Sequence, residues 1–129
     1  MKLGYVLLYV DDVERTMSFY EKTFGLKKGF LHEAKAYGEM ITGETKLGFV
    51  SHSLVETHGF KYDKVNLQKN PPPNEIAFTT PDVEKAFSHA IACGAVELSK
   101  PNKKPWGQTV ALVRDMNGFI VEISSPMGN

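Results

Sequence analysis

Two glutamates lie alone within otherwise apolar, strand-like segments, where a carboxylate can act in acid–base chemistry or bind a cation. Glu75 opens the segment 75–80, and Glu122 lies inside the segment 119–124. If both side chains face a partly enclosed cavity, desolvation and mutual repulsion raise the pKa of at least one of them. A raised carboxyl pKa suits general acid–base catalysis. The same alternation also fits glutamates that face solvent on an open sheet, so both interpretations remain open at this point.

An aromatic and an amide side chain near the C-terminal end form a second candidate group. Trp106 is the only tryptophan, and Gly107 beside it lets a ligand or backbone approach closely. Trp106 either stacks on a flat ligand at the rim of a cavity or covers a loop. Gln108 either hydrogen-bonds a ligand or pairs across the edge of a strand. The residues alone leave both choices open.

The segments around these residues are repeated within the chain. Asp12–Glu14 recurs as Asp82–Glu84, which is an offset of 82 − 12 = 70 residues. Each copy follows an apolar strand-like segment and precedes apolar residues at helical spacing. The same offset relates Tyr5 to Glu75, since 75 − 5 = 70. This self-similarity predicts two copies of one structural unit.

The hydrophobic periodicity predicts the same elements in each copy. The first strand-like segment ends at Asp11 or Asp12, either of which can cap the helix that follows, and Gly25 suits the end of that helix. In the second copy Thr80 or Asp82 is the expected cap and Gly94 the expected end. Each helix is followed by three predicted strands. The predicted strands are 3–10, 27–32, 37–42 and 46–51 in the first copy, and 75–80, 96–99, 108–114 and 119–124 in the second.

Three connecting segments carry local structural signals. The spacing of Ser53 and Glu56 is that of a capping box and predicts a short helix. Asn70–Asn74 contains three consecutive prolines, which cannot continue a helix or a central strand, and it is the best linker candidate. Asn117 and Gly118 can take positive φ, which predicts a hairpin turn before the last strand.

We therefore predict an α+β fold of two tandem βαβββ modules that form a curved, barrel-like mixed sheet cup with helices outside. The first module with its linker is assigned to 1–70 and the second to 71–129. Each helix buries its apolar stripe against one face of its sheet, which leaves the other face to line the cup. Alternation places Tyr5, Tyr9 and Gly48 on the cup side in the first module, and Glu75 and Glu122 in the second.

Composition and charge exclude several classes of partner. The chain has 15 basic and 15 acidic residues, and the lysines lie scattered among acids, so we expect no nucleic-acid partner. No apolar run approaches the length of a membrane span, and the run 3–10 ends in two aspartates without a small-residue cleavage site, so we interpret it as a strand and not as a signal peptide. A single cysteine, Cys93, cannot form an internal disulfide, and this fits a cytoplasmic location.

The whole chain resembles the vicinal oxygen chelate superfamily, which includes glyoxalase I, bleomycin-resistance proteins, fosfomycin-resistance proteins and extradiol dioxygenases. The resemblance rests on three motifs: YVDDVERTMSFYEKTFGL, DVEKAFSHAIACGA and KPWGQTVALVRDMNGFIVEI. These motifs are more specific for the fold than for an activity. The resemblance also implies a homodimer, with or without modules exchanged between subunits.

In metal-using members of that superfamily, the ligands come from equivalent strands of the two modules. The resemblance places these ligand positions on Tyr5, on or near Gly48, on Glu75 and on Glu122. Gly48 offers no side-chain donor, and two carboxylates plus water hold a divalent ion weakly. The resemblance therefore implies no cofactor and no tightly bound catalytic metal; any divalent metal ion that binds would be held by Glu75 and Glu122.

The leading hypothesis is a small-molecule binding protein of the glyoxalase/bleomycin-resistance type. Its ligand is expected to contact Tyr5, Tyr9, Gly48, Trp106 and Gln108, and to be oriented by the two glutamates. The alternative is a metal-dependent lyase, isomerase or dioxygenase-like enzyme in which Glu75 and Glu122 are the catalytic residues. A pure interaction module is disfavoured, because unpaired carboxylates inside a cup reduce stability.

Overall fold

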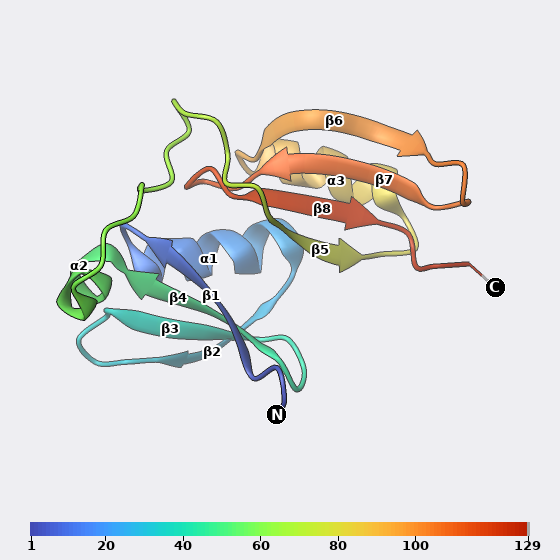
Figure 1. The fold of residues 1–129 in the computed structure, drawn as a ribbon. Coiled ribbons are helices and arrows are strands. Elements are labelled where there is room, and N and C mark those ends of the chain that lie inside the picture. The colour runs from blue at the N-terminus through green and yellow to red at the C-terminus, as the bar shows by residue number, and fades with distance from the viewer. Residues whose placement is uncertain (129) are drawn as a thin grey trace. The chain divides into compact units, whose positions relative to one another are not determined.

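The computed structural model describes residues 1–128, which form two compact units of the same design. The first unit is Met1–Lys64, and the second begins at Val65. Each unit contains one strand, one helix and three further strands in that order along the chain (Figure 1). This agrees with the duplication that the sequence repeat predicts.

The first unit contains a four-stranded mixed sheet. The strands lie in the order β1-β4-β3-β2, with β1 parallel to β4 and the other neighbours antiparallel. Its elements are β1 (Tyr5–Val10), α1 (Val13–Phe24), β2 (Lys27–Leu31), β3 (Tyr37–Ile41), β4 (Lys46–Ser51), α2 (His52–Val55) and the short 3₁₀ helix η1 (Glu56–His58).

The second unit repeats this topology. Its strands lie in the order β5-β8-β7-β6, with β5 parallel to β8 and the other neighbours antiparallel. Its elements are β5 (Glu75–Thr79), α3 (Val83–Ala92), β6 (Val96–Lys103), β7 (Thr109–Arg114) and β8 (Ile120–Ser124). The α+β fold of two βαβββ modules is confirmed, and each sheet is open.

Equivalent aspartates begin the two long helices. The Asp12 carboxylate accepts a hydrogen bond from the Arg15 amide at 2.9 Å, and the Asp82 carboxylate accepts one from the Lys85 amide at 3.1 Å. Each bond satisfies an amide that the helix itself leaves free. Gly25 ends α1 in the left-handed region at φ 71°. The repeated aspartates thus set where each helix starts.

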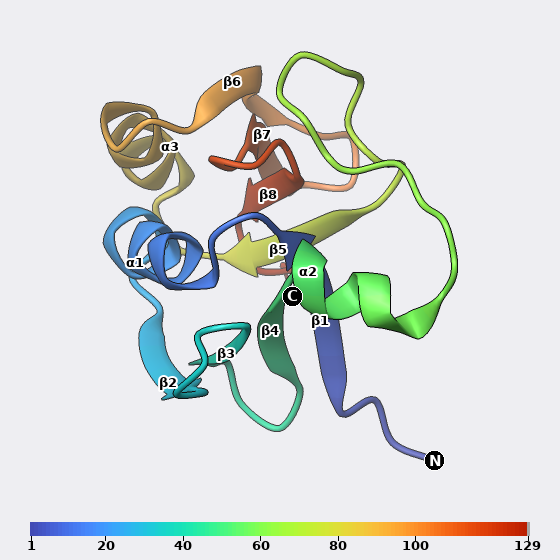
Figure 2. The same cartoon turned by 90° about the vertical axis from the view of Figure 1, so that its left-hand side faces the viewer.

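One face of each sheet is covered by its own helix (Figure 2). The buried face of α1 contains Val13, Thr16, Met17, Tyr20 and Thr23. Helical spacing of the apolar residues favours Phe24 as the last buried position, but Phe24 is half-buried. In the first unit the core includes Leu8, Val10, Met17, Tyr20, Leu47 and Phe49; in the second it includes Phe87, Ala90, Val113, Val121 and Ile123. Burying these stripes stabilises each unit by about 25 cal/mol per Å² of apolar surface.

The turn between β7 and β8 is held by a buried aspartate. The Asp115 carboxylate accepts hydrogen bonds from the amides of Asn117, Gly118 and Phe119 at 2.9, 2.9 and 3.0 Å. The predicted hairpin turn is present, and of its two candidate residues Gly118 takes positive φ, at 112°, whereas Asn117 does not. The side chain of Asp115 organises the turn, which removes the need for a second left-handed residue.

A buried arginine attaches the start of the second unit to its sheet. The Arg114 side chain donates to the carbonyl oxygens of Asn66, Leu67, Lys69 and Gly118 at 3.1, 3.3, 2.9 and 2.8 Å. Arg114 is only 7% exposed, so these carbonyls replace water around its charge. Arg114 thus ties the segment 66–69 to the sheet, in addition to the hydrogen bonds that the segment makes within itself.

Two further elements differ from the sequence expectation. The short helix begins at His52, and its cap is Ser51, whose hydroxyl accepts from the Leu54 amide at 3.3 Å; Ser53 is not the cap. Strand β6 continues past Ser99 to Lys103, because irregularities in its pairing with β7 accommodate the extra length. Pro101 is tolerated there because β6 is an edge strand.

Replacing the buried guanidinium tests its role in stability. We expect Arg114→Lys to lower the free energy of unfolding by about 2 kcal/mol. The planar guanidinium group of arginine donates to four carbonyl oxygens at once, and the compact ammonium group of lysine cannot. Urea denaturation followed by circular dichroism measures the change. The matched control Arg15→Lys, on the exposed face of α1, should unfold as the native protein does. Equal midpoints for the two variants would contradict this account.

Candidate functional site

Glu75 and Glu122 lie on the same face of the second sheet. In the parallel pair β5–β8, Ala77 lies opposite Glu122 and Glu75 lies opposite Ile120. Paired residues share a face, so Glu75 is diagonally adjacent to Glu122. Val121, which alternates with Glu122, is fully buried. The two carboxyl groups therefore lie on the face opposite α3.

The two carboxyl groups interact directly. Burial, a hydrogen bond to the Glu122 carboxyl group and the negative charge of Glu122 all raise the pKa of Glu75 above its ordinary value. A hydrogen bond between two carboxyl groups requires a proton on one of them. The pair therefore holds a proton at a pH at which an isolated glutamate has lost it, and it can both donate and accept hydrogen bonds.

The corresponding face of the first sheet carries aromatic side chains. Tyr5, Leu7 and Tyr9 of β1 lie opposite Lys46, Gly48 and Val50 of β4. Tyr5 is 57% exposed, and Tyr9 is half-buried. The structure thus places the predicted residues Tyr5, Tyr9 and Gly48 on one face of the first unit.

Gly48 occupies the place in the first unit that Glu122 occupies in the second. Gly48 lies opposite Leu7 in the first unit, and Glu122 lies opposite Ala77 in the second. Ala77 is 70 residues further along the chain than Leu7, the offset of the repeat. A Cβ at Gly48 would lie 2.7 Å from Leu7 Cδ2 and 3.0 Å from the Tyr37 hydroxyl oxygen. Neighbouring side chains therefore fill the space in which a metal-binding side chain at this position would begin.

Two residues of β3 that the sequence analysis missed supply polar groups beside Gly48. Glu39 lies opposite Gly48, and its carboxylate accepts a hydrogen bond of 2.7 Å from the Tyr37 hydroxyl. Burial, this hydrogen bond and the charge of Glu39 raise the pKa of Tyr37, so its phenol stays protonated. Alternation in β3 already places Tyr37 and Glu39 on one face; only the pairing with β4 shows which face it is.

Trp106 and Gln108 contact each other at the end of the second sheet. The Trp106 indole N–H donates to Gln108 Oε1 at 2.8 Å, and Gln108 Nε2 donates to the Ser125 carbonyl oxygen at 2.7 Å. Gln108 thus links the indole to the backbone that follows β8. Trp106 nevertheless remains 60% exposed, so its ring is available for stacking.

The available donors do not fit a tightly held divalent ion within either unit. Within residues 1–128, no three or more His, Cys, Asp and Glu side chains are grouped so as to hold a metal ion. In the second unit the donors brought together are the two carboxyl groups, which interact with each other. In the first unit Gly48 lacks a side chain, and the Glu39 carboxylate is engaged by Tyr37.

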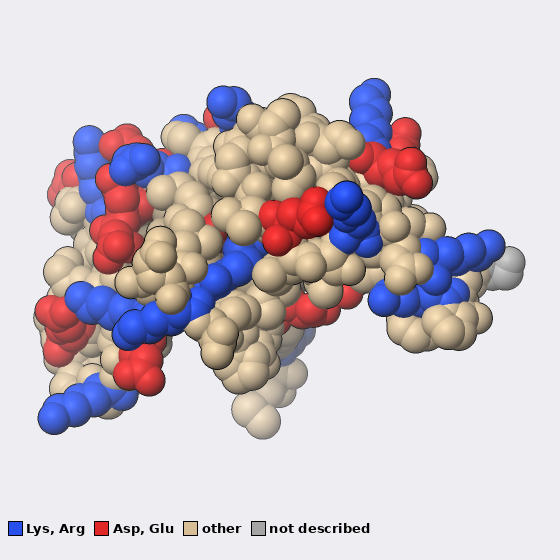
Figure 3. Space-filling model, turned by 90° about the horizontal axis from the view of Figure 1, so that it is seen from above, with Lys and Arg blue, Asp and Glu red and all other residues tan. Residues whose placement is uncertain are grey.

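The charged surface shows no single dominant sign. Acidic and basic side chains are interspersed on the face seen in Figure 3, as the formal net charge of zero suggests. An extended basic stripe, the usual feature of nucleic-acid binding, is not seen on the coloured part of that face. None of the helices within residues 1–128 has the length and apolar character needed to cross a membrane.

A family model for the glyoxalase-like domain matches residues 3–128. One relative is the uncharacterized protein YraH of Bacillus subtilis (strain 168). It is 29% identical over 126 residues, which cover 95% of this chain and 97% of the relative. The similarity therefore extends over nearly the full length of both proteins.

Solved structures with this fold include two proteins of the same broad group. A glyoxalase-related enzyme from Fulvimarina pelagi superposes with a TM-score of 0.82 at 20% identity, covering 98% of this chain and 88% of that one. A glyoxalase/bleomycin resistance protein/dioxygenase family enzyme from Burkholderia phytofirmans PsJN gives 0.73 at 20% identity, covering 97% and 98%. At such identities the structures share the fold. With the family match over residues 3–128, the chain belongs to the glyoxalase-like domain family of the vicinal oxygen chelate superfamily.

Proposed function

We propose that the protein binds a small molecule, as bleomycin-resistance proteins do, without a tightly bound catalytic metal. The observation that carries the proposal is the carboxyl pair Glu75–Glu122 on the face of the second sheet opposite α3. Glu75 is exposed and Glu122 is half-buried, so a ligand can reach both carboxyl groups. A hydrogen-bonded carboxyl pair can donate one hydrogen bond and accept others, which suits a polar ligand.

The remaining contacts in the proposal come from aromatic surface. Tyr5 and Trp106 are more than half exposed, and each offers a flat apolar face with a polar edge. Tyr9, Gly48 and Gln108 complete the proposed set. Ligand pockets of this kind are mostly apolar, with a few polar groups that fix orientation.

The cellular setting belongs to the same proposal. We propose a cytoplasmic homodimer, with the lone Cys93 as the supporting observation for a reducing compartment. The exposed apolar side chains Tyr5, Leu7 and Leu3 at the start of the chain support a contact between subunits.

A second candidate function is a lyase or isomerase that works by acid–base catalysis. The raised pKa of Glu75 favours it, because a carboxyl group that keeps its proton to a higher pH than an ordinary glutamate is better suited to act as a general acid. Glu122 is then the general base. This version needs no metal ion, and both groups come from adjacent strands of one sheet.

Chelation tests the metal-free proposal. Because the donors do not form a complete ligand set, EDTA should leave the melting temperature of the purified native protein unchanged, and elemental analysis should find far less than one metal ion per chain. A fall of several degrees, reversed by a single divalent ion, would count against the proposal.

The pH dependence of stability tests the carboxyl pair. The pKa of Glu75 is raised in the folded state, so its contribution to stability is fully present below the unfolded-state pKa and is lost as pH rises through the folded-state pKa. Glu75→Gln keeps a neutral hydrogen-bond donor at every pH. We therefore expect the melting temperature of Glu75→Gln minus that of the native protein to increase as the pH is raised from 4 to 8. The matched control is Glu84→Gln on α3. A difference independent of pH would refute the shared proton.

The variant Glu122→Gln separates the two candidate functions once a ligand is found by a thermal-shift screen of small polar compounds. If the protein is an enzyme, kcat should fall at least about 100-fold while the ligand still raises the melting temperature. If it is a binding protein, no turnover of the ligand is detected with either protein, and Glu122→Gln weakens binding alone. Turnover that survives Glu122→Gln unchanged excludes the acid–base version.

A further inference from the structure

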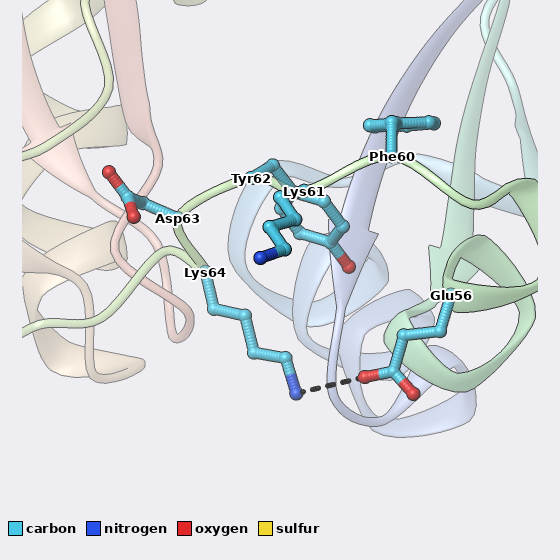
Figure 4. A pocket seen from close by; sticks show the side chains of 6 residues that line it. All are labelled: Glu56, Phe60, Lys61, Tyr62, Asp63 and Lys64. Carbon is cyan, nitrogen blue, oxygen red and sulfur yellow. Dashed lines mark ion pairs between the residues drawn. The ribbon is translucent and has the colours of Figure 1, made fainter.

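We infer that a second pocket, formed by the first unit alone, binds a planar aromatic carboxylate. The pocket has a volume of about 550 Å³ and is lined by Glu56, Phe60, Lys61, Tyr62, Asp63 and Lys64 (Figure 4). This volume lies in the range of small-molecule pockets. The inference goes beyond the proposed function and does not depend on the Glu75–Glu122 pair.

The aromatic wall of this pocket is held in place by a buried histidine. The Tyr62 hydroxyl lies 2.7 Å from His52 Nδ1, and the two rings stack at 5.7 Å with an interplanar angle of 24°. His52 is only 5% exposed. Tyr9 packs against Tyr62 edge to face at 5.2 Å. Tyr62 is thus fixed before any ligand arrives, which lowers the entropic cost of binding.

The protonation states of the histidine and tyrosine agree with this geometry. Burial lowers the pKa of His52, so its imidazole is neutral at pH 7, and burial raises the pKa of Tyr62, so its phenol keeps its proton. A neutral imidazole and a protonated phenol can share one hydrogen bond at Nδ1, and the other ring nitrogen, Nε2, lies 3.7 Å from the Asp11 carboxylate. The positive charge of Lys64 lowers the pKa of both groups, and the negative charge of Glu56 raises it.

An exposed phenylalanine extends the apolar surface of the pocket. Phe60 is 51% exposed, and its ring lies 5.8 Å from that of Tyr62 at an angle of 47°. His58 stacks on Phe60 at 6.4 Å. Flat rings with one open face favour a flat aromatic partner, by stacking and by loss of exposed apolar area.

One lysine of the pocket lining is available to an anionic ligand. Lys64 forms an ion pair with Glu56 at 3.5 Å, whereas neither Lys61 nor Asp63 forms an ion pair within residues 1–128. In Figure 4 the ammonium groups of Lys61 and Lys64 project to one side of the segment, and the Asp63 carboxylate points away from them. A carboxylate on the ligand can pair with Lys61 in a charge-assisted hydrogen bond.

Titration with three naphthalene probes of matched size tests the ring and the charge together. The probes are 2-naphthoate, neutral 2-naphthalenemethanol and cationic 2-naphthylmethylamine. Binding is followed by the amide NMR shifts of ¹⁵N-labelled full-length protein at pH 7. We expect 2-naphthoate to bind tightest, with the largest shift changes at the amides of residues 56–64.

Two variants assign the binding to named side chains. Lys61→Ala should weaken 2-naphthoate binding about tenfold and leave 2-naphthalenemethanol binding unchanged, because only the charged contact is lost. Phe60→Ala should weaken both probes. The matched control is Lys85→Ala on the exposed face of α3, which should bind as the native protein does. Lys61 and Phe60 are exposed, so both variants are expected to fold, and their NMR spectra check this.

Each outcome decides the inference. Tightest binding by the carboxylate, with the Lys61 effect, supports it. Equal binding of the three probes, shift changes confined to other residues, or no detectable binding at millimolar probe overturns it. Glu122→Gln is measured in parallel and should bind 2-naphthoate normally. A loss in that variant would overturn the assignment to the first unit, whereas failure of the carboxyl-pair predictions would leave this result standing.

Discussion

Everything proposed for this protein depends on the parallel pairing of the first and last strands in each unit. A parallel pair cannot be joined by a tight turn, so the chain must cross over, and in both units it does so first through a helix. The helix buries one face of the sheet and leaves the other face to side chains from the two paired strands. Glu75 and Glu122 are 47 residues apart, yet this pairing makes them neighbours.

The two units use one topology for different chemistry. At equivalent places the second unit has Glu122 and the first has Gly48. In the first unit a carboxylate appears one strand further along the sheet, at Glu39, and the Tyr37 hydroxyl engages it. The second unit leaves its carboxyl groups to each other, which raises the pKa of Glu75. Duplication preserved the backbone plan, because cap and core residues set it, while the open faces were free to diverge.

In each unit a buried polar side chain helps to hold an irregular segment. Arg114 donates to the carbonyls of Asn66, Leu67 and Lys69, and His52 hydrogen-bonds with the phenol of Tyr62. Neither segment is part of a strand, so these side chains supply hydrogen bonds that strand pairing would otherwise supply. In the first unit the contact with His52 holds the ring of Tyr62 in place, and the ring of Phe60 packs against Tyr62. The two rings form the aromatic wall of the pocket. Rigid display of rings is what separates a pocket from a collapsed loop.

The sequence by itself determined the duplication, the order of elements and the isolation of Glu75 and Glu122 in apolar strands, and it narrowed each helix cap to two candidates. These features are local: periodicity and capping depend on residues within a few positions of each other. Only the tertiary structure decided that the caps are Asp12 and Asp82, that the two carboxyl groups interact and raise the pKa of Glu75, that Tyr37 fills the space beside Gly48, and that His52 contacts Tyr62. Those facts depend on strand register and on contacts between residues far apart in the chain, which local patterns do not specify.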